Sequence, residues 1–119
     1  MIGEVVQTST GSYVRCAAES GIINQERDLL DLLACCGELD SNRALLDEAH
    51  LHPDFFDLST GLAGAILGKF AIYHVKAAIV ADLDAIPSQR FRELVGECNR
   101  GDQFHFFRGL AEAEQWLTA

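Results

Sequence analysis

A short apolar run late in the chain limits the fold more than any other feature of the sequence. The segment Lys76-Ala-Ala-Ile-Val-Ala81 is apolar after its first residue and shows no alternation between apolar and polar positions. A short run of this kind is typical of a β-strand that is buried on both faces. Because both faces of such a strand need a covering layer, the run predicts an α/β fold with helices packed on a sheet.

The segments before this strand predict a hairpin and a first helix. Residues 4–8 and 12–17 are β-prone runs joined by a short loop that contains Gly11, which is typical of an antiparallel hairpin. Asn24 is a good N-cap, and apolar residues recur at helical spacing after it. We expect this helix to end at Gly37, which suits the left-handed residue after a helix.

The middle of the chain predicts a third strand, a loop and a second helix. The apolar run at residues 44–46 is too short for a helix, and Pro53 interrupts any regular ladder after it. Ser59 or Thr60 is expected to cap a helix that ends near Tyr73. The small residues Gly61, Ala65 and Gly68 share one side of this helix, so we expect that side to press closely against the sheet.

The end of the chain completes the alternation. Pro87-Ser88 is a helix start signal, and Asn99-Arg-Gly101 is a stop signal. Residues 102–108 predict an aromatic-rich strand, and a closing helix follows with Leu110, Ala113, Trp116 and Leu117 on one face. The order ββαβαβαβα predicts one domain, residues 1–119, built as a mixed sheet covered by helices.

Charge and composition exclude several classes of function. The formal net charge is -9, from 18 acidic and 9 basic residues, and this excess of negative charge opposes binding to a phosphate backbone. The sequence has no signal-peptide pattern and no apolar run long enough to span a bilayer, so we expect a cytoplasmic protein that does not act at a membrane. The 4 cysteines lack C-x-x-C spacing and are expected to be reduced packing residues. No cofactor is indicated.

A polar segment before the second helix carries the likeness to known families. Residues 55–64 read FFDLSTGLAG, followed by Lys69-Phe70 and Tyr73, and later by ECNRG at residues 97–101 and AEQWL at residues 113–117. With these residues the chain resembles a small bacterial family known as domain of unknown function 4180. The resemblance covers nearly the whole chain, and it implies no established activity, ligand or cofactor.

The predicted order of elements is similar, more distantly, to that of STAS domains, the fold of bacterial anti-sigma factor antagonists. Those domains carry D-S-S-G-L at the start of the helix after the third strand, where this chain has Leu58-Ser-Thr-Gly-Leu62. The resemblance places Thr60 on the hydroxyl that STAS domains phosphorylate, with Ser59 before it and Gly61 as a direct match. Leu58 replaces the Asp of the motif, and Asp57 lies one residue earlier.

Elementary electrostatics explains how such a segment would act as a switch. The first turn of a helix has free N–H donors and the positive end of the helix dipole, so it tolerates a phosphate. The added charge, about -1.5 to -2, would still oppose a desolvated contact with a partner. Alternatively, Ser59 or Thr60 is only a helix cap that contributes about 1 kcal/mol, assisted by Asp57.

A second hypothesis comes from the loop before this segment. His50, His52 and Asp54 have H-x-H-x-D spacing, in which alternate side chains of an extended segment project to one side and share a divalent metal. Asp57 or Asp82 would be a further ligand. This alternative is a small metal-dependent enzyme or a ligand-binding protein.

The sequence therefore favours a non-enzymatic, cytoplasmic regulatory module that binds a protein partner through Asp57, Ser59, Thr60 and Gly61. The identity of the partner does not follow from the sequence, and the partner can also be a second copy of the chain, in a homodimer. A phenylalanine of the last strand, if exposed at a sheet edge, would mark the surface for either.

Overall fold

The computed structural model describes residues 3–17 and 21–119. Its strands are β1 (Gly3–Thr8), β2 (Gly11–Cys16), β3 (Arg43–Asp47), β4 (Lys76–Val80) and β5 (Phe104–Phe107). Its α-helices are α1 (Glu26–Glu38), α2 (Leu62–Ile72), α3 (Gln89–Cys98) and α4 (Leu110–Leu117). This order confirms the predicted ββαβαβαβα alternation.

The strands form one mixed sheet in the order β1-β2-β3-β4-β5. The β1–β2 hairpin is antiparallel, and the other three pairs of neighbouring strands are parallel. Ala44 of β3 lies opposite Ala77 of β4, and Ile79 of β4 lies opposite Phe106 of β5. The sheet therefore has parallel strands in its interior and at one edge, with the hairpin at the other edge.

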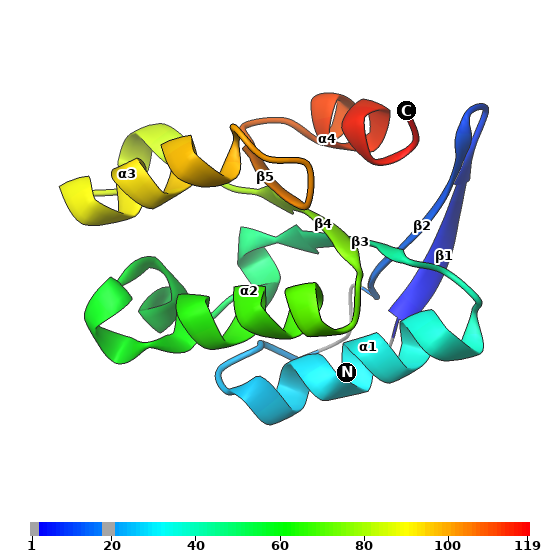
Figure 1. Ribbon diagram of the computed structural model, residues 1–119, viewed down its shortest axis with the longest axis horizontal. Helices are drawn as coiled ribbons and strands as arrows, with labels where there is room; N and C mark the ends of the chain where they lie inside the picture. The colour runs from blue at the N-terminus through cyan, green and yellow to red at the C-terminus, as the bar shows by residue number, and fades with distance from the viewer. Residues whose placement is uncertain (1–2, 18–20) are drawn as a thin grey trace.

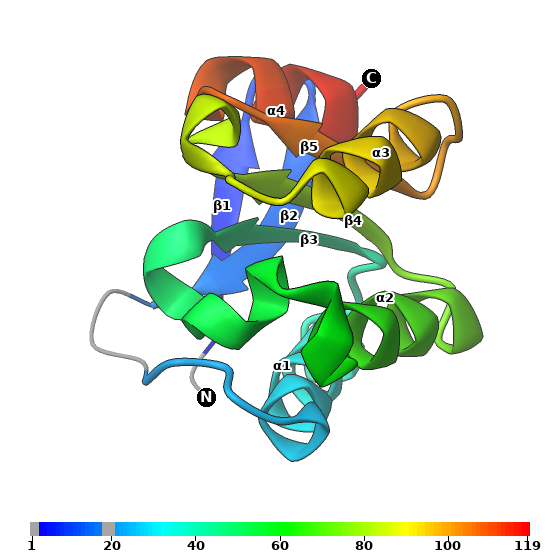
Figure 2. The same ribbon diagram turned by 90° about the vertical axis from the view of Figure 1, so that its left-hand side faces the viewer.

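The helices cover the two faces unequally (Figures 1 and 2). Helices α1, α2 and α3 contribute to the core cluster on one face, and α4 contributes to the cluster on the other. Each of the first three helices connects a strand to its next neighbour in the same direction. Because such crossovers have one handedness, they place their helices on the same face of the sheet. Among the helices of the described residues, α4 alone, which follows the last strand, covers the opposite face.

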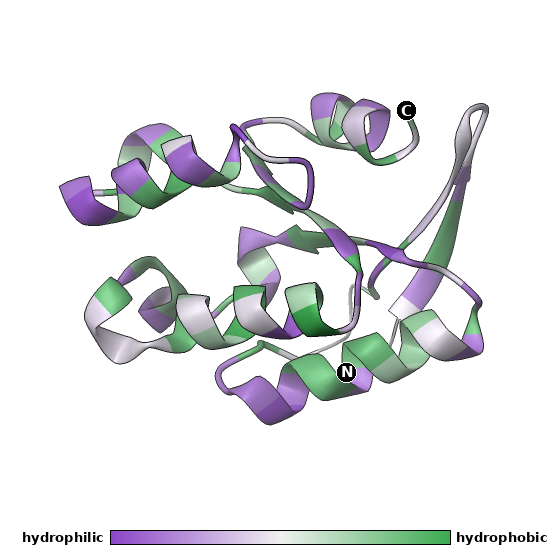
Figure 3. Ribbon diagram, viewed as in Figure 1, coloured by the Kyte–Doolittle hydropathy of each residue, from purple (hydrophilic) through white to green (hydrophobic). Residues whose placement is uncertain are grey.

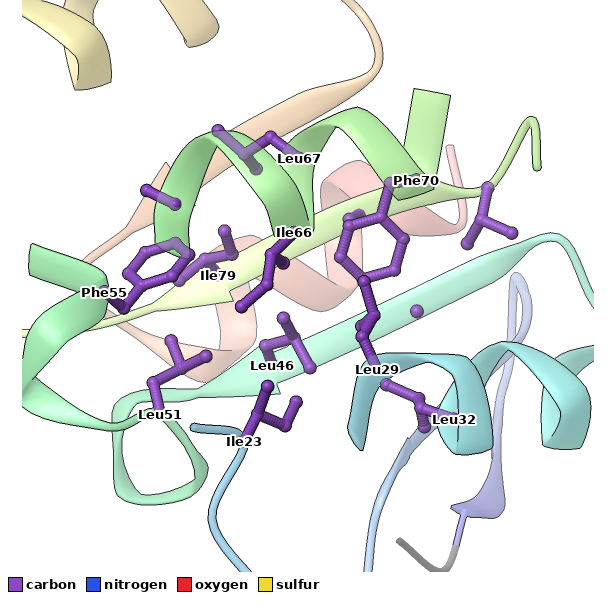
Figure 4. Packing of buried hydrophobic residues seen from close by; sticks show 14 of the residues in the cluster. Ile23, Leu29, Leu32, Leu46, Leu51, Phe55, Ile66, Leu67, Phe70 and Ile79 are labelled. Atoms are coloured by element: carbon purple, nitrogen blue, oxygen red, sulfur yellow. The ribbon is translucent and has the colours of Figure 1, made fainter. Parts of the chain in front are cut away.

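Side chains that alternate along the strands build the two core clusters. In the larger cluster, Leu46 and Ile79 of the sheet pack with Phe55, Ile66 and Phe70, all of which are buried (Figure 4). The smaller cluster under α4 consists of Tyr13, Leu45, Ala78, Ala113 and Leu117. Because β4 contributes to both clusters, the prediction of a strand buried on both faces is confirmed.

At the outer edge of β5, one side chain pairs with the backbone of Phe106. The Asn99 Oδ1 atom accepts a hydrogen bond from the Phe106 N–H at 2.8 Å, and Asn99 Nδ2 donates to the Phe106 carbonyl at 3.3 Å. The amide of Asn99 therefore takes the place that a neighbouring strand would occupy. This pairing protects a sheet edge that would otherwise offer free backbone groups.

The start and end predicted for the first helix are wrong. Helix α1 has Gln25, not Asn24, at its N-cap, and the Asn24 N–H donates to the Asp28 carboxylate at 3.1 Å. The helix continues through Gly37 to Glu38, and the residue with positive φ after it is Asp40, at 54°. Asp has a short polar side chain that tolerates the left-handed conformation, so a glycine is not required there.

The prediction that α2 presses its small residues against the sheet is also wrong. Of the three predicted residues, Gly61 and Gly68 are exposed and Ala65 is only half-buried. A Cβ atom added to Gly61, Gly68 or the neighbouring exposed Gly64 would have nothing within 4 Å. The side of α2 that faces the core instead holds the large residues Leu62, Ile66, Leu67 and Phe70. Because these residues occupy the core side, the small residues on the opposite side face outward. Figure 3 accordingly shows little hydrophilic colour along α2.

No helix within residues 3–17 and 21–119 has both the length and the apolar character needed to cross a bilayer.

Candidate functional site

The chain between β3 and α2 is folded into three short 3-10 turns, η1 (Glu48–His50), η2 (Pro53–Phe56) and η3 (Leu58–Thr60). Each turn is preceded by a residue whose side chain accepts a backbone N–H of that turn: Asp47, His52 and Asp57. Turn residues and caps of this kind satisfy donors that lack a helical partner. The segment is therefore ordered by its own polar side chains, although it contains no long helix.

Residues Asp57–Gly61, called the hinge below, begin with a charged side chain that holds two donors. The Asp57 Oδ1 atom accepts the Ser59 N–H at 3.0 Å and the Ser59 hydroxyl at 2.7 Å. These two hydrogen bonds, with the hydroxyl bond the larger cause, lower the pKa of Asp57 below its ordinary value. Asp57 is therefore ionised at neutral pH.

The hydroxyl of Thr60 also forms hydrogen bonds within this segment. Its hydroxyl lies 2.7 Å from the Asp54 carbonyl and 2.9 Å from the Asp57 carbonyl, and it accepts the Leu62 N–H at 3.2 Å. The Thr60 hydroxyl has a single hydrogen atom, which it donates to one of the two carbonyls at a time or shares between them. Thr60 thus joins η2, η3 and the first turn of α2.

The prediction that Ser59 or Thr60 occupies the N-cap of the second helix is wrong. Gly61 is the N-cap residue of α2 and has a left-handed backbone, with φ at 79°, which a glycine adopts without strain. Ser59 and Thr60 belong to η3 instead. Asp57, Ser59, Thr60 and Gly61 are all exposed.

A hollow of about 360 Å³ adjoins the hinge. It lies where β3 and β4 end, because Glu48 directly follows β3 and Asp82 follows β4. The segments after these two strands lie on the left-hand side of Figure 1 and face the reader in Figure 2. Open α/β sheets commonly bind ligands at this end of their strands. The hollow is lined by Glu48, Pro53, Phe56, Asp57, Asp82, Ala85, Ile86 and Pro87.

The hollow combines apolar walls with carboxylates. Phe56 forms one wall and is held in place by aromatic neighbours, with ring centroids 5.1 Å from Phe55 and 5.3 Å from Phe91. The Glu48 Oε1 atom accepts the Asp82 N–H at 3.3 Å, which ties the ends of β3 and β4 together. Three of the lining residues are acidic, and none of them is basic.

The residues of the metal hypothesis do not converge. The described part of the chain contains no group of three His, Cys, Asp or Glu side chains placed to hold a metal ion. His52 Nδ1 accepts the Asp54 N–H at 3.0 Å, whereas His50 lines a separate hollow with Arg15 and Asp47. Alternate side chains point to one side only in an extended strand, and this segment is folded into turns.

Reasoning from the sequence singled out Asp57 and Asp82 but missed Glu48 and Phe56, which line the same hollow. A signal for Glu48 was present, because it follows the apolar run of a predicted parallel strand, as Asp82 does. Residues at the carboxyl ends of adjacent parallel strands meet at one edge of the sheet. For Phe56 there was no such signal, since its position depends on the 3-10 turn that contains it.

Comparison with known proteins places the chain in a family. Residues 8–117 match the family described as Domain of unknown function (DUF4180). The chain belongs to the DUF4180 family. No curated protein and no solved structure matches it. The resemblance of this DUF4180 chain to STAS domains is therefore not confirmed.

Proposed function

We propose that this DUF4180 chain is a non-enzymatic protein-interaction module, which binds a partner protein through the hinge and the adjoining hollow and is regulated at the hinge. The observation that carries the proposal is the hinge itself: an exposed turn whose shape depends on a few side-chain hydrogen bonds and which borders an apolar hollow. Exposed apolar hollows with a few polar groups are the usual places where proteins bind ligands and partner side chains.

The regulated hydroxyl in this proposal is that of Ser59. Its Oγ atom makes one hydrogen bond, to Asp57, whereas the Thr60 hydroxyl contacts two carbonyls and a backbone N–H. A kinase that transfers a phosphoryl group from a nucleoside triphosphate to Ser59 Oγ displaces only the hydroxyl proton and one hydrogen bond. Modification of Thr60 would disrupt a larger part of the turn before any partner is present.

A phosphate on Ser59 has two opposing effects, and their sizes decide the outcome. It removes the hydroxyl donor and places negative charge beside Asp57, so the turn opens and the wall of the hollow changes. Each exposed ion pair that the phosphate gains with a partner contributes at most about 1 kcal/mol. If the turn is disordered, it has to be ordered again when the partner binds. The free-energy cost of that ordering is several times the contribution of one exposed ion pair. We therefore expect phosphorylation to weaken binding.

The experiment compares partner capture from the native host by the wild-type chain and three variants. Ser59→Asp imitates the added charge and should reduce the recovery of a stoichiometric partner about tenfold or more, whereas Ser59→Ala should retain it, since the Ser59 N–H still bonds to Asp57. Gln115→Glu adds the same charge on α4, away from the hinge, and should bind like the wild type. Equal recovery by all three variants would contradict the proposal.

We also place the protein in the cytoplasm. All four cysteines are free thiols. Burial raises the pKa of the Cys16 and Cys36 thiols to about 11, so neither is a reactive thiolate at neutral pH. Free, unreactive thiols suit a reducing compartment. Fractionation of the native host with an antibody against the chain tests this assignment.

A further inference from the structure

We infer that the hollow beside the hinge binds a basic side chain, arginine or lysine, of the partner protein. The inference rests on the proposed function and names the chemistry of the partner at that site. The aliphatic stem of such a side chain would lie against Phe56, Ile86 and Pro87, and its charged end would lie among the carboxylates of the hollow. A side chain with an apolar stem and a cationic head matches both properties of these walls.

The charge of the hollow selects a cation. Glu48, Asp57 and Asp82 line it without a basic residue among the other lining residues. The nearby Arg108 lines a different hollow, and its Nη2 atom is paired with Asp84 Oδ1 at 2.9 Å. That arginine therefore acts most strongly on Asp84, and it interacts with Asp82 of the hollow only weakly. An acidic or phosphorylated partner segment would meet like charge here, which opposes binding.

The walls select an organic cation rather than a bare ion. The described residues form no set of three ligands around a metal position. A guanidinium or ammonium group does not need such a set, because it forms hydrogen bonds with carboxylates that lie farther apart. The volume of about 360 Å³ is within the range of ligand pockets, roughly 300–1,000 Å³, so a single long side chain fits.

Order in the site supports recognition of one side chain. The Glu48–Asp82 hydrogen bond holds two of the acidic residues on neighbouring strand ends, and the Phe56 ring packs against both Phe55 and Phe91. A site that is already ordered loses less conformational freedom on binding. The partner side chain therefore enters a hollow that is already formed at the C-terminal ends of β3 and β4.

The test is an NMR titration of the ¹⁵N-labelled chain with the probe peptide acetyl-Ala-Leu-Arg-Leu-Ala-amide. We expect saturable shifts of the amide signals of Phe56, Asp57, Asp82 and Ala85. The same peptide with citrulline, which keeps the shape of arginine without its charge, should bind about tenfold more weakly. Raising the salt concentration tenfold should weaken the arginine peptide at least threefold, because the contact depends on charge.

Matched variants separate the hollow from the general negative charge of the protein. Glu48→Gln combined with Asp82→Asn should reduce affinity for the arginine peptide about tenfold, and Gln at position 48 retains the acceptor for the Asp82 N–H. Glu93→Gln combined with Glu97→Gln removes the same charge from exposed positions of α3 and should change affinity less than twofold. The amide spectrum of each variant shows whether it is folded.

Several results would overturn the inference. Equal affinity for the arginine and citrulline peptides would do so, as would shifts located away from the hollow. Tighter binding of butylguanidine, which carries the same single guanidinium charge without a peptide, would indicate a small-molecule site instead of a protein-binding one. If Ser59→Asp abolishes partner capture while the arginine peptide does not bind, the proposed function stands and this inference is wrong. If the peptide binds and Ser59→Asp has no effect on capture, the regulated hinge is wrong.

Discussion

At the scale of single residues, the hinge depends on the hydrogen bonds that Asp57 receives from Ser59. The Ser59 hydroxyl is the larger cause of the lowered pKa of Asp57, and the Ser59 N–H is the second. A carboxylate with a lowered pKa stabilises the folded chain at pH values above about 3.9, the pKa of Asp in the unfolded chain, and this contribution is lost as the pH falls through the folded-state pKa. The hinge should therefore be fully ordered at neutral pH and loosen in acid.

This dependence gives a direct prediction for the Ser59→Ala variant. Because the hydroxyl donor is removed and the N–H donor is kept, the pKa of Asp57 should rise part of the way towards its ordinary value. An NMR titration of the side-chain carboxyl carbons measures the change. Asp84 is an internal control, since its pKa is lowered by Arg108 and not by the hinge. An unchanged pKa of Asp57 would show that the hydroxyl does not hold this carboxylate.

A second residue-scale prediction concerns the edge of the sheet. Asn99→Ala removes both hydrogen bonds to the backbone of Phe106, which is a buried residue. The substitution should lower the free energy of unfolding by about 1–2 kcal/mol. Because the open edge can pair with another chain, the variant should also aggregate sooner on heating. Asn24→Ala, at a position that does not cap α1, should change stability by less than about 0.5 kcal/mol. Denaturant unfolding measures the free energy of unfolding of both variants. Equal losses of stability in Asn99→Ala and Asn24→Ala would contradict the prediction.

At the scale of elements, the sequence predicted the order and most of the faces, and it failed where no periodic signal exists. The β4 run and the Ser88 cap of α3 were strong signals, and the Ser88 hydroxyl does accept the Phe91 N–H at 3.2 Å. The three turns between β3 and α2 are too short to show a period. The side of α2 that carries Gly61, Ala65 and Gly68 was misread because nearly all residues of this helix are apolar or small, so composition does not distinguish its two sides.

The corrected orientation of α2 leads to an element-scale prediction. Gly64→Ala and Gly68→Ala should each raise the free energy of unfolding by about 0.5–1 kcal/mol, because a methyl group meets nothing within 4 Å and alanine favours the helix. Gly61→Ala should instead destabilise, since its φ of 79° strains an L-residue. Thermal unfolding of the three variants measures the difference. Destabilisation by Gly64→Ala or Gly68→Ala would mean that this side of α2 is covered in solution.

At the scale of the whole molecule, the core and the candidate site occupy different parts of the fold. The core clusters fill the space between the sheet and its helices, and the exposed polar turns after β3 and β4 meet at the carboxyl edge of the sheet. Three acidic residues line the hollow there, in a chain whose formal net charge is -9. The negative charge of the whole protein therefore adds to the attraction of a basic partner, which should bind faster at low salt than at high salt.

The central claim is that a partner protein docks where β3 and β4 end, on the hinge and the adjoining hollow. Hydrogen exchange followed by mass spectrometry on the complex with the captured partner tests it most directly, with the free chain as the reference. Slower exchange is predicted for the turn segments at residues 48–61 and 82–87, with little change along β1 and α2. Protection of β1 or of the outer side of α2, with residues 48–61 and 82–87 exchanging as in the free chain, would contradict the claim.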